Sequence, residues 1–425
     1  MRVRFAPLTF AIVLGLTSLG CSDPSGPVPG DPITELPRNL TVVEQELIQR
    51  SNGFGLELFR RVVAEDGRPN VLLSPLSASM ALGMTLNGAR QGTFDAMSGT
   101  LGYEGLSQDE INEAYRDLID LLTGLDPAVR FDIANAIWAN EEITFRDAFF
   151  DAVQAAFDAE AASRDFADPA TLEEINAWVD ERTEGFIDSI LDDLDPDLAM
   201  LLVNAIYFDG AWTTRFDPED TAPGPFQRAD GSSVTVDMMR LTDVEVALGG
   251  GNDYQTAELP YGGGAFAMTL VVPTGDARAF ADQLDDTRWA DIVEGLGEPH
   301  DIDLLSMPKM SIGYDAWLND ALRAMGMGVA FTGDADFTGM SEGVGLCIDF
   351  VRQKTMLEVD EAGTRAAAVT AVGVGPTSFN GLMVDRPFIL AIRERLSGTV
   401  LFVGLVGDPT VEDSDPAEAQ DGCVP

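Results

Sequence analysis

The chain has 425 residues, of which 45% are hydrophobic, enough to fill the core of one large domain or of two moderate ones. Its 71 acidic residues outnumber its 26 lysines and arginines, for a formal net charge of −45. Such a charge opposes binding to nucleic-acid phosphates or to anionic lipid by bulk electrostatics, so we expect no nucleic-acid partner.

The first residues are typical of an export signal. Two arginines precede an apolar run from residue 5 to residue 16, and small residues then lead to Gly20-Cys21. This order is that of a signal peptide, and the apolar run is too short for a good membrane span. The Gly20-Cys21 step is similar to the cleavage and lipidation point of bacterial lipoproteins. The sequence therefore predicts a signal peptide over 1–21 and an exported protein, either extracellular or anchored to a membrane through a lipidated Cys21. Simple secretion is the alternative to lipidation.

Three further regions follow in chain order. Prolines and glycines crowd residues 22–41, a composition that favours an extended tether. Beyond this tether an amphipathic helix is expected, and then strand-like runs such as 201–208 alternate with helical stretches such as 172–190. No second linker interrupts them, so we predict one α+β domain over 42–409. The acidic residues 410–425 have nothing to bury, and we expect them to be disordered.

The three cysteines suit an exported protein that does not depend on disulfides. Cys21 belongs to the signal, Cys347 lies in a strand-like run over 345–351, and Cys423 lies in the acidic tail. They are too few and too widely spaced for a metal site. A Cys347–Cys423 bridge is one alternative, but a buried free Cys347 is the interpretation we favour.

Residues that could support catalysis are scarce. The single histidine, His300, belongs to a polar stretch that is typical of a surface loop, so no base is available to orient a serine nucleophile. The glycine-rich segments 262–264 and 373–375 lack the strand-glycine-helix context of a nucleotide loop. We therefore predict a protein that is not an enzyme, with no catalytic residue, no metal and no cofactor.

Residues 358–372 read EVDEAGTRAAAVTAV, a run of small residues led by acids. A loop that slides into a β-sheet must be narrow, because neighbouring strands lie only about 4.8 Å apart. Side chains alternate along a strand, so an outward Arg365 would bring Ala367 and Val369 to the same face. The inward residues would then be Thr364, Ala366, Ala368 and Thr370, which are all small. An alanine-rich helix is the alternative, and the glycines and β-branched residues of the run disfavour it.

This segment resembles the hinge of the reactive-centre loop of serpins, a family of suicide protease inhibitors. Further blocks are similar to serpin segments in the family's order, at 70–88, 201–212, 305–309, 384–388 and 401–409. The resemblance implies an α+β serpin fold, with mixed helices around three β-sheets and an exposed reactive-centre loop. It also implies a monomer whose partner is a serine protease held as a covalent acyl complex. The hinge residues would be Glu361, Gly363, Thr364, Arg365, Ala366, Ala367, Ala368, Val369 and Thr370.

The resemblance also assigns two sites within the main sheet. One is the breach, where the loop would enter, with Trp212 and an ion pair between Lys309 and Glu358. The other is the shutter near the middle of the sheet, formed by Ser74, Ser77, Asn204 and Gln353. Gln353 stands where the family usually has histidine, so the shutter would keep its hydrogen bonds without a titratable member.

Counting from Gly363 by the family's usual loop length places the reactive bond at Thr377–Ser378. A β-branched residue before that bond suits elastase-like or subtilisin-like proteases. The register could shift by one residue, and a shift of two would present Phe379 to a chymotrypsin-like pocket. The alternative function is a non-inhibitory serpin that acts as a binding or chaperone-like protein. Such relatives tend to carry bulky, charged or proline residues in the hinge, and this hinge does not.

Overall fold

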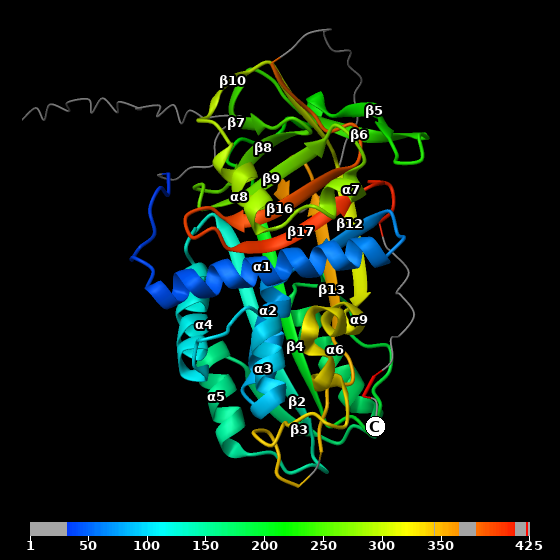
Figure 1. Cartoon of the computed structure of the whole chain (residues 1–425). Coiled ribbons are helices and arrows are strands. Elements are labelled where there is room, and N and C mark those ends of the chain that lie inside the picture. Colours follow the sequence, from blue (N-terminus) through cyan, green and yellow to red (C-terminus); the bar gives the residue numbers. More distant parts are fainter. Residues whose placement is uncertain (1–31, 344, 365–379, 413–421, 424–425) are drawn as a thin grey trace, which may run out of the picture.

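Figure 1 shows the computed structural model of the chain, which describes residues 32–343, 345–364, 380–412 and 422–423. Helices cluster around three β-sheets, and the predicted fold class is confirmed. The helices are α1 (Val42–Glu65), α2 (Pro75–Leu86), α3 (Gln91–Thr100), α4 (Gln108–Leu122), α5 (Asp147–Phe157), α6 (Pro169–Arg182), α7 (Ala277–Ala281), α8 (Asp286–Glu294) and α9 (Asn319–Leu322).

In two of the sheets, every strand is hydrogen-bonded to its neighbours without a break. The larger has the order β1-β17-β16-β9-β8-β7-β10, and the smaller has the order β15-β11-β6-β5. The larger sheet contains β1 (Asn70–Leu73), β7 (Val244–Gly250), β8 (Tyr254–Tyr261), β9 (Phe266–Pro273), β10 (His300–Ile302), β16 (Phe388–Glu394) and β17 (Val400–Val406). The smaller contains β5 (Ala222–Gln227), β6 (Ser233–Leu241), β11 (Leu304–Pro308) and β15 (Gly381–Met383).

The third sheet is divided into two groups of strands that are not hydrogen-bonded to each other in the described structure. One has the order β14-β4-β2-β3, and the other pairs β12 with β13. Their strands are β2 (Val129–Asn140), β3 (Glu160–Arg164), β4 (Met200–Ala211), β12 (Met310–Trp317), β13 (Arg352–Val359) and β14 (Gly363–Thr364). We call the space between β4 and β13 the sheet gap.

Local sequence explains where the first helices begin. Thr41 caps α1 in a capping box with Glu44, because each side chain accepts a hydrogen bond from the backbone of the other residue. Ser74 caps α2 and Pro75 follows at its first position, where a helix needs no N–H donor. Helix α6 ends at Arg182, earlier than the predicted 172–190, because the chain takes left-handed conformations directly beyond it.

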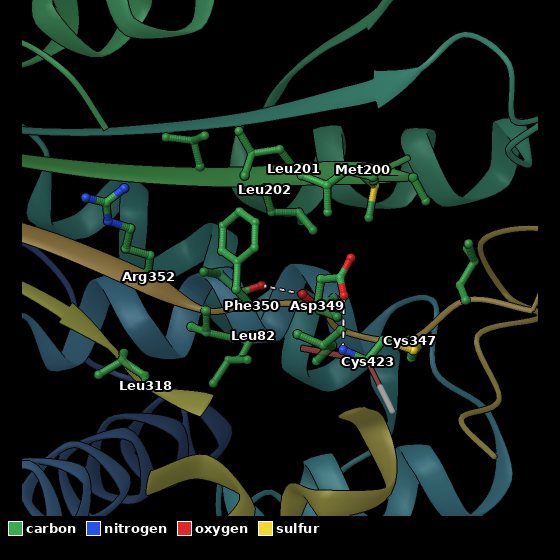
Figure 2. A pocket seen from close by; sticks show the side chains of 18 of the residues that line it. Leu82, Met200, Leu201, Leu202, Leu318, Cys347, Asp349, Phe350, Arg352 and Cys423 are labelled. Carbon is green, nitrogen blue, oxygen red and sulfur yellow. Dashed lines mark hydrogen bonds between the residues drawn. A yellow bond between two sulfur atoms is a disulfide. The ribbon is translucent and has the colours of Figure 1, made fainter. Parts of the chain in front are cut away.

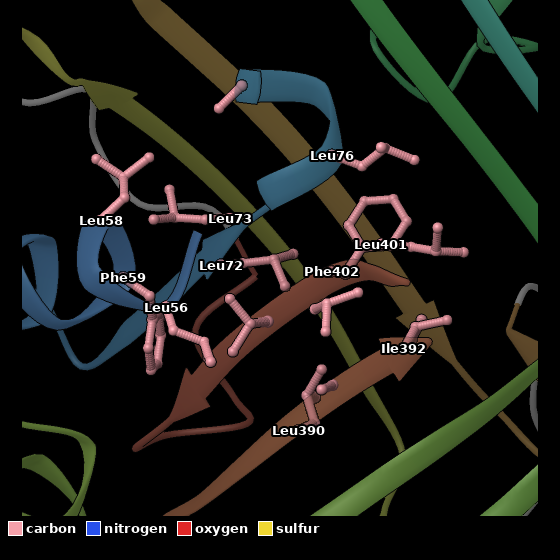
Figure 3. Close-up of a cluster of buried hydrophobic side chains, with 14 of the residues drawn as sticks. Leu56, Leu58, Phe59, Leu72, Leu73, Leu76, Leu390, Ile392, Leu401 and Phe402 are labelled. Atoms are coloured by element: carbon pink, nitrogen blue, oxygen red, sulfur yellow. The ribbon is translucent and has the colours of Figure 1, made fainter. Parts of the chain in front are cut away.

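The core lies between α1, α2 and the larger sheet (Figure 3). Side chains of α1, β1 and the start of α2 meet those of β16 and β17, all less than 5% exposed. They include Leu56, Leu58, Phe59, Leu72, Leu73, Leu76, Leu390, Ile392, Leu401 and Phe402. Burial of this kind contributes about 1.5–3 kcal/mol per large side chain, so this layer supplies a large part of the folding free energy.

The end of the predicted tether lies against the domain. Ile33 donates its backbone N–H to the Gly263 carbonyl at 2.8 Å, and Arg38 pairs with Glu44 at 2.6 Å. Residues 32–41 are therefore not a free spacer, because apolar and charged side chains within them find partners on α1 and the β8–β9 turn. Among the described helices, none is both long enough and apolar enough to cross a membrane.

Replacing Leu390 by alanine removes a fully buried side chain from β16. We expect the free energy of unfolding to fall by about 2–5 kcal/mol, because a cavity remains where methyl groups packed. Urea denaturation followed by far-ultraviolet circular dichroism measures this change. The matched control is Val42→Ala at the exposed start of α1, which should change the value by no more than about 0.5 kcal/mol. Equal effects of the two substitutions would contradict this view of the core.

Candidate functional site

The sheet gap separates two strands that run side by side without pairing. β4 pairs with β2 along nearly its whole length, from Met200↔Ala139 to Gly210↔Val129. β13 pairs with β12 on its other side, also along its whole length. Among the described residues, the facing edges of β4 and β13 form no ladder with each other. These edges therefore carry backbone N–H and C=O groups that an added strand could pair with.

The beginning of the predicted hinge already occupies one end of this gap. Gly363 and Thr364 form β14, which pairs antiparallel with Ala211 and Gly210 at the C-terminal end of β4. A Cβ on Gly363 would approach the Gly210 carbonyl oxygen to 2.1 Å, so only glycine fits there. Thr364 is buried and its hydroxyl lies 2.8 Å from that of Tyr261. The predicted inward orientation of Thr364 is confirmed.

Two cavities continue from this end along the gap. The first, of about 30 Å³, lies between Ala205–Phe208 of β4 and Thr355–Leu357 of β13. The second, of about 290 Å³, lies further along, between the start of β4 and residues 345–354, next to α2. Figure 2 shows apolar side chains around the second cavity, among them Leu82, Leu201, Leu202 and Phe350. The gap thus has unfilled space where an additional strand would place its side chains.

Ser74 and Gln353, two of the predicted shutter residues, are directly bonded. The side-chain oxygen of Gln353 accepts from the Ser74 N–H, and its nitrogen donates to the Ser74 carbonyl, both at 2.9 Å. The Ser74 hydroxyl donates to the Leu401 carbonyl at 2.7 Å and accepts from the Ser77 N–H at 3.3 Å. An amide can donate and accept at once, so Gln353 fastens β13 to the start of α2 without a titratable group.

Ser77 and Asn204, the other predicted shutter residues, line both cavities but do not bond to Gln353 in the described structure. Asn204 donates instead to the side-chain oxygen of Asn135 on β2 at 2.6 Å. Asn135 in turn donates to the Phe157 carbonyl at 2.6 Å. Sequence reasoning missed Asn135, although an amide between apolar residues in the middle of a strand is a signal that could have found it.

Trp212 lies at the base of the hinge, as predicted for the breach. Its ring stacks on Tyr261, with centroids 4.4 Å apart and planes inclined by 14°. Its indole N–H donates to the Asp360 carbonyl at 2.8 Å, and its backbone N–H donates to the Ala362 carbonyl at 3.0 Å. Trp212 therefore holds the turn between β13 and β14, and Tyr261 and Asp360 are site residues that sequence reasoning missed.

The predicted ion pair between Lys309 and Glu358 is wrong. Lys309 pairs with Glu361, at 2.9 Å between Nζ and Oε2, and Thr221 donates to the other carboxylate oxygen at 2.7 Å. Glu358 lies opposite Ser311 in the ladder and belongs to the part-exposed residues that alternate with the buried ones of β13. Strand periodicity therefore turns Glu358 away, while the turn after β13 brings Glu361 toward Lys309.

The pKa values of Asp360 and Glu361, two neighbouring carboxylates of this turn, are shifted in opposite directions. Burial opposes the charged form of Glu361, but hydrogen bonds from Lys309 and Thr221 outweigh it and leave the pKa of Glu361 below its ordinary value. Burial raises the pKa of Asp360, although its carboxylate accepts hydrogen bonds from the N–H groups of Ala362 and Gly363. The shift of the pKa of Asp360 thus opposes its ionisation, whereas the shift of the pKa of Glu361 favours it.

Cys347 is not a free thiol. It forms a disulfide with Cys423, with 5.8 Å between the two Cα atoms, and both residues line the larger cavity (Figure 2). The favoured interpretation of the sequence was wrong because the tail does not remain apart from the domain. It returns to the far end of the sheet gap, where residues 345–351 form no strand.

Several predicted residues lie outside the described part of the chain, and their roles stay predictions. They are Cys21, Arg365, Ala366, Ala367, Ala368, Val369, Thr370, Thr377 and Ser378. His300 is described at the start of β10, where it is exposed and pairs with Val246.

A central sheet with an unfilled gap, a hinge that starts to enter it and a fastened entrance define the serpin class of protein. A family model described as serpin (serine protease inhibitor) matches residues 49–409, so the chain belongs to the serpin family. Serpins are generally extracellular and mostly inhibit serine proteases, although some bind other molecules and do not inhibit.

Two curated relatives are similar over most of the chain. Iripin-5 from Ixodes ricinus is 32% identical over 375 residues, which cover 85% of this chain and 95% of the relative. Serpin A3-3 from Bos taurus is 30% identical over 391 residues, which cover 88% of this chain and 94% of the relative.

Two solved structures illustrate the range of the family. The thermophilic serpin Tengpin in its native state has a TM-score of 0.76 and 28% identity, covering 90% of this chain and 97% of its own. Human thyroxine-binding globulin, solved as a complex with thyroxine, has a TM-score of 0.78 and 28% identity, covering 87% and 100%. The fold alone therefore does not decide between inhibition and binding.

Replacing Glu361 by glutamine leaves Lys309 without its charged partner at the hinge base. We expect a loss of about 1–3 kcal/mol in the free energy of unfolding, because the pair is largely buried and hydrogen-bonded. Thermal unfolding monitored by circular dichroism measures the change. Glu358→Gln is the matched control, since it removes a neighbouring carboxylate that faces away, and it should have little effect. A larger effect at residue 358 would contradict the observed pairing.

The Lys309–Glu361 ion pair should also make the stability of the fold depend on pH. A carboxylate with a lowered folded-state pKa stabilises the fold above its ordinary pKa, and this stabilisation is lost as pH falls through the folded-state value. The difference in melting temperature between the wild-type protein and Glu361→Gln should therefore stay constant from about pH 7 to about pH 5, begin to fall below the ordinary glutamate pKa of about 4.3, and be lost as pH falls through the lower folded-state pKa. Loss of the difference already near pH 6 would disagree with a lowered pKa.

Proposed function

We propose that this protein is an inhibitory serpin, a suicide substrate that traps extracellular serine proteases of elastase-like or subtilisin-like specificity. This proposal rests on the structure of the sheet gap. Two parallel-running edges lie open between β4 and β13, cavities follow them, and the hinge starts at one end with Gly363 and Thr364. A loop with small inward side chains is the segment of this chain that suits such a gap.

The protease carries out the first chemical step. Its serine oxygen attacks the carbonyl carbon of Thr377, the peptide bond to Ser378 breaks, and the Ser378 nitrogen leaves as a protonated amine. An ester then joins Thr377 to the protease. The bond has been cut, so the residues before it are free to move away from those after it.

Insertion of the freed segment competes with hydrolysis of the ester. Residues Gly363 to Gly375 would extend over roughly 40 Å as a strand, at about 3.3 Å per residue. A strand of that length would pair with both open edges of the gap and carry the bound protease along the sheet. Pro376, which cannot donate to a ladder, suits the end of the inserted strand. Native-state strain released on insertion drives the trap.

The target class follows from the residue before the cut. Thr377 offers a medium-sized β-branched side chain to the primary pocket of the protease, and no lysine or arginine flanks it. This favours elastase-like and subtilisin-like enzymes over trypsin-like ones. We further propose that the protein is exported through residues 1–21 and that Cys21 is lipidated, which would fix the inhibitor to a membrane.

The second candidate is a binding protein without inhibitory activity, as the similarity to thyroxine-binding globulin in complex with thyroxine illustrates. The hinge sequence argues against it here. Ala366, Ala367 and Ala368 carry no bulk that would stop the strand from entering the gap.

A matched pair of substitutions tests the alternation of the hinge. Ala366→Glu places a charge on the inward side, where burial without a partner is strongly unfavourable, so insertion should slow and the protease should turn the inhibitor over as a substrate. We expect the stoichiometry of inhibition to rise by about tenfold or more. Ala367→Glu, one residue further on the outward side, should leave it nearly unchanged. Equal effects would contradict the assigned faces.

Incubation with an elastase-type and a subtilisin-type protease tests the function itself. Denaturing gels and mass spectrometry should show a covalent complex whose cleavage site is Thr377–Ser378. Clean clipping without a complex, and without a rise in melting temperature, would remove the insertion mechanism for these proteases and favour the binding alternative. A complex cut at another bond would keep the mechanism and correct the register.

A further inference from the structure

The C-terminal end of the chain is fastened to the far end of the sheet gap. Beyond β17 the chain reaches the outer edge of β12, where the Gly313 N–H donates to the Glu412 carbonyl at 2.5 Å. It is described again at Gly422 and Cys423, beside the larger cavity. We call the contacts of these last two residues with Cys347, Asp349 and Arg323 the C-terminal clasp.

The clasp combines one covalent bond with close polar contacts. Cys423 is disulfide-bonded to Cys347, and its backbone N–H donates to the Asp349 carboxylate at 3.0 Å. Arg323 donates to the Gly422 carbonyl at 2.8 Å. A Cβ at residue 422 would lie 2.7 Å from the Asp349 carboxylate oxygen, so any larger residue there would displace this carboxylate. The sequence of the tail therefore fits the place where it docks.

The clasp contacts residues 345–351, which we call the wall of the sheet gap. Cys347 and Asp349 belong to residues 345–351, which continue toward β13 and line the larger cavity opposite the start of β4 (Figure 2). This wall is not part of the ladder, which ends at Trp317↔Arg352. Asn319 holds the wall on its other side, donating to the Asp349 carbonyl at 2.9 Å and accepting from the Val351 N–H at 2.8 Å.

The position of the wall matters for insertion, because an entering strand must pair along it after passing the shutter. A wall tied to the tail and to Asn319 cannot move freely away from β4 or take up a strand conformation. We propose that the C-terminal clasp restrains the opening of the far half of the sheet gap, with the Cys347–Cys423 bond as its fastening. The proposal rests on the proposed function, since the restraint acts on the path of the reactive loop.

The disulfide has a second consequence through chain topology. Cys347 precedes the reactive loop and Cys423 follows it, 76 positions further along the sequence. The bond therefore closes a ring that contains residues 365–379 and the strands β15, β16 and β17. A cut at Thr377–Ser378 opens this ring without separating the two parts, so the cleaved protein remains one covalent molecule.

Hydrogen exchange of the full-length protein tests the restraint without any protease. Cys423→Ser removes the fastening and leaves Cys347 in place. We expect amide exchange in residues 345–351 and at the start of β4 to accelerate by about tenfold or more, while exchange in the core strands β16 and β17 stays unchanged. A phosphine reductant, which is oxidised as it converts the disulfide to two thiols, should reproduce this in the wild-type protein and have no effect on Cys423→Ser. Unchanged exchange in the wall would overturn the proposal.

Loop insertion without protease provides the second readout. We expect incubation at raised temperature to convert this protein to an inserted form with a higher melting temperature, and Cys423→Ser should convert faster, by about threefold or more. Equal rates together with faster exchange would show that the wall is not the barrier, and would overturn the restraint. No conversion in either protein would count against the proposed function, while hydrogen exchange would still decide whether the clasp restrains the wall.

Denaturing gels after cleavage of the loop test the ring. Without reductant the cleaved wild-type protein should run as one species, and with reductant it should release the fragment that begins at the cut. Cys423→Ser should release this fragment in both cases. Release from the unreduced wild-type protein would show that the bond is absent in solution, and the fastening would be overturned.

Discussion

The unpaired edges of β4 and β13 are the constraint on which the other features depend. Backbone N–H and C=O groups inside a folded domain need partners, and these two strands hold theirs open along cavities rather than closing on each other. Three neighbouring parts of the described structure border this arrangement. β14 fills one end, α2 lies beneath the middle, and the C-terminal end of the chain is attached at the far end.

The gap is held by three fastenings of different chemistry. The breach uses the Lys309–Glu361 ion pair and the Trp212–Tyr261 stack, which restrain the base of the hinge. The shutter uses neutral hydrogen bonds between Gln353 and Ser74, whose strength does not change with pH over the physiological range. The clasp uses a covalent bond. Because the sheet is held at these three places, β4 and β13 can stay apart without pairing with each other.

The sequence was sufficient for the parts of the site that depend on local pattern. The capping serine and the following proline of α2, the strand that carries Asn204 and the small inward residue Thr364 all follow from periodicity or helix-start chemistry. The partner of Lys309 could not be found in the same way. Glu358 and Glu361 are both acidic residues near the hinge, and only the ladder register and the turn after β13 decide between them.

By itself the sequence determined the family, the start of α2 and the strand that carries Asn204, because these depend on motifs and on spacings of a few residues. The tertiary structure decided which carboxylate pairs with Lys309, that Asn204 bonds to Asn135, and that Cys423 meets Cys347. These contacts join segments that are far apart along the chain. Their geometry depends on strand register and on how the tail packs, and no local pattern encodes either.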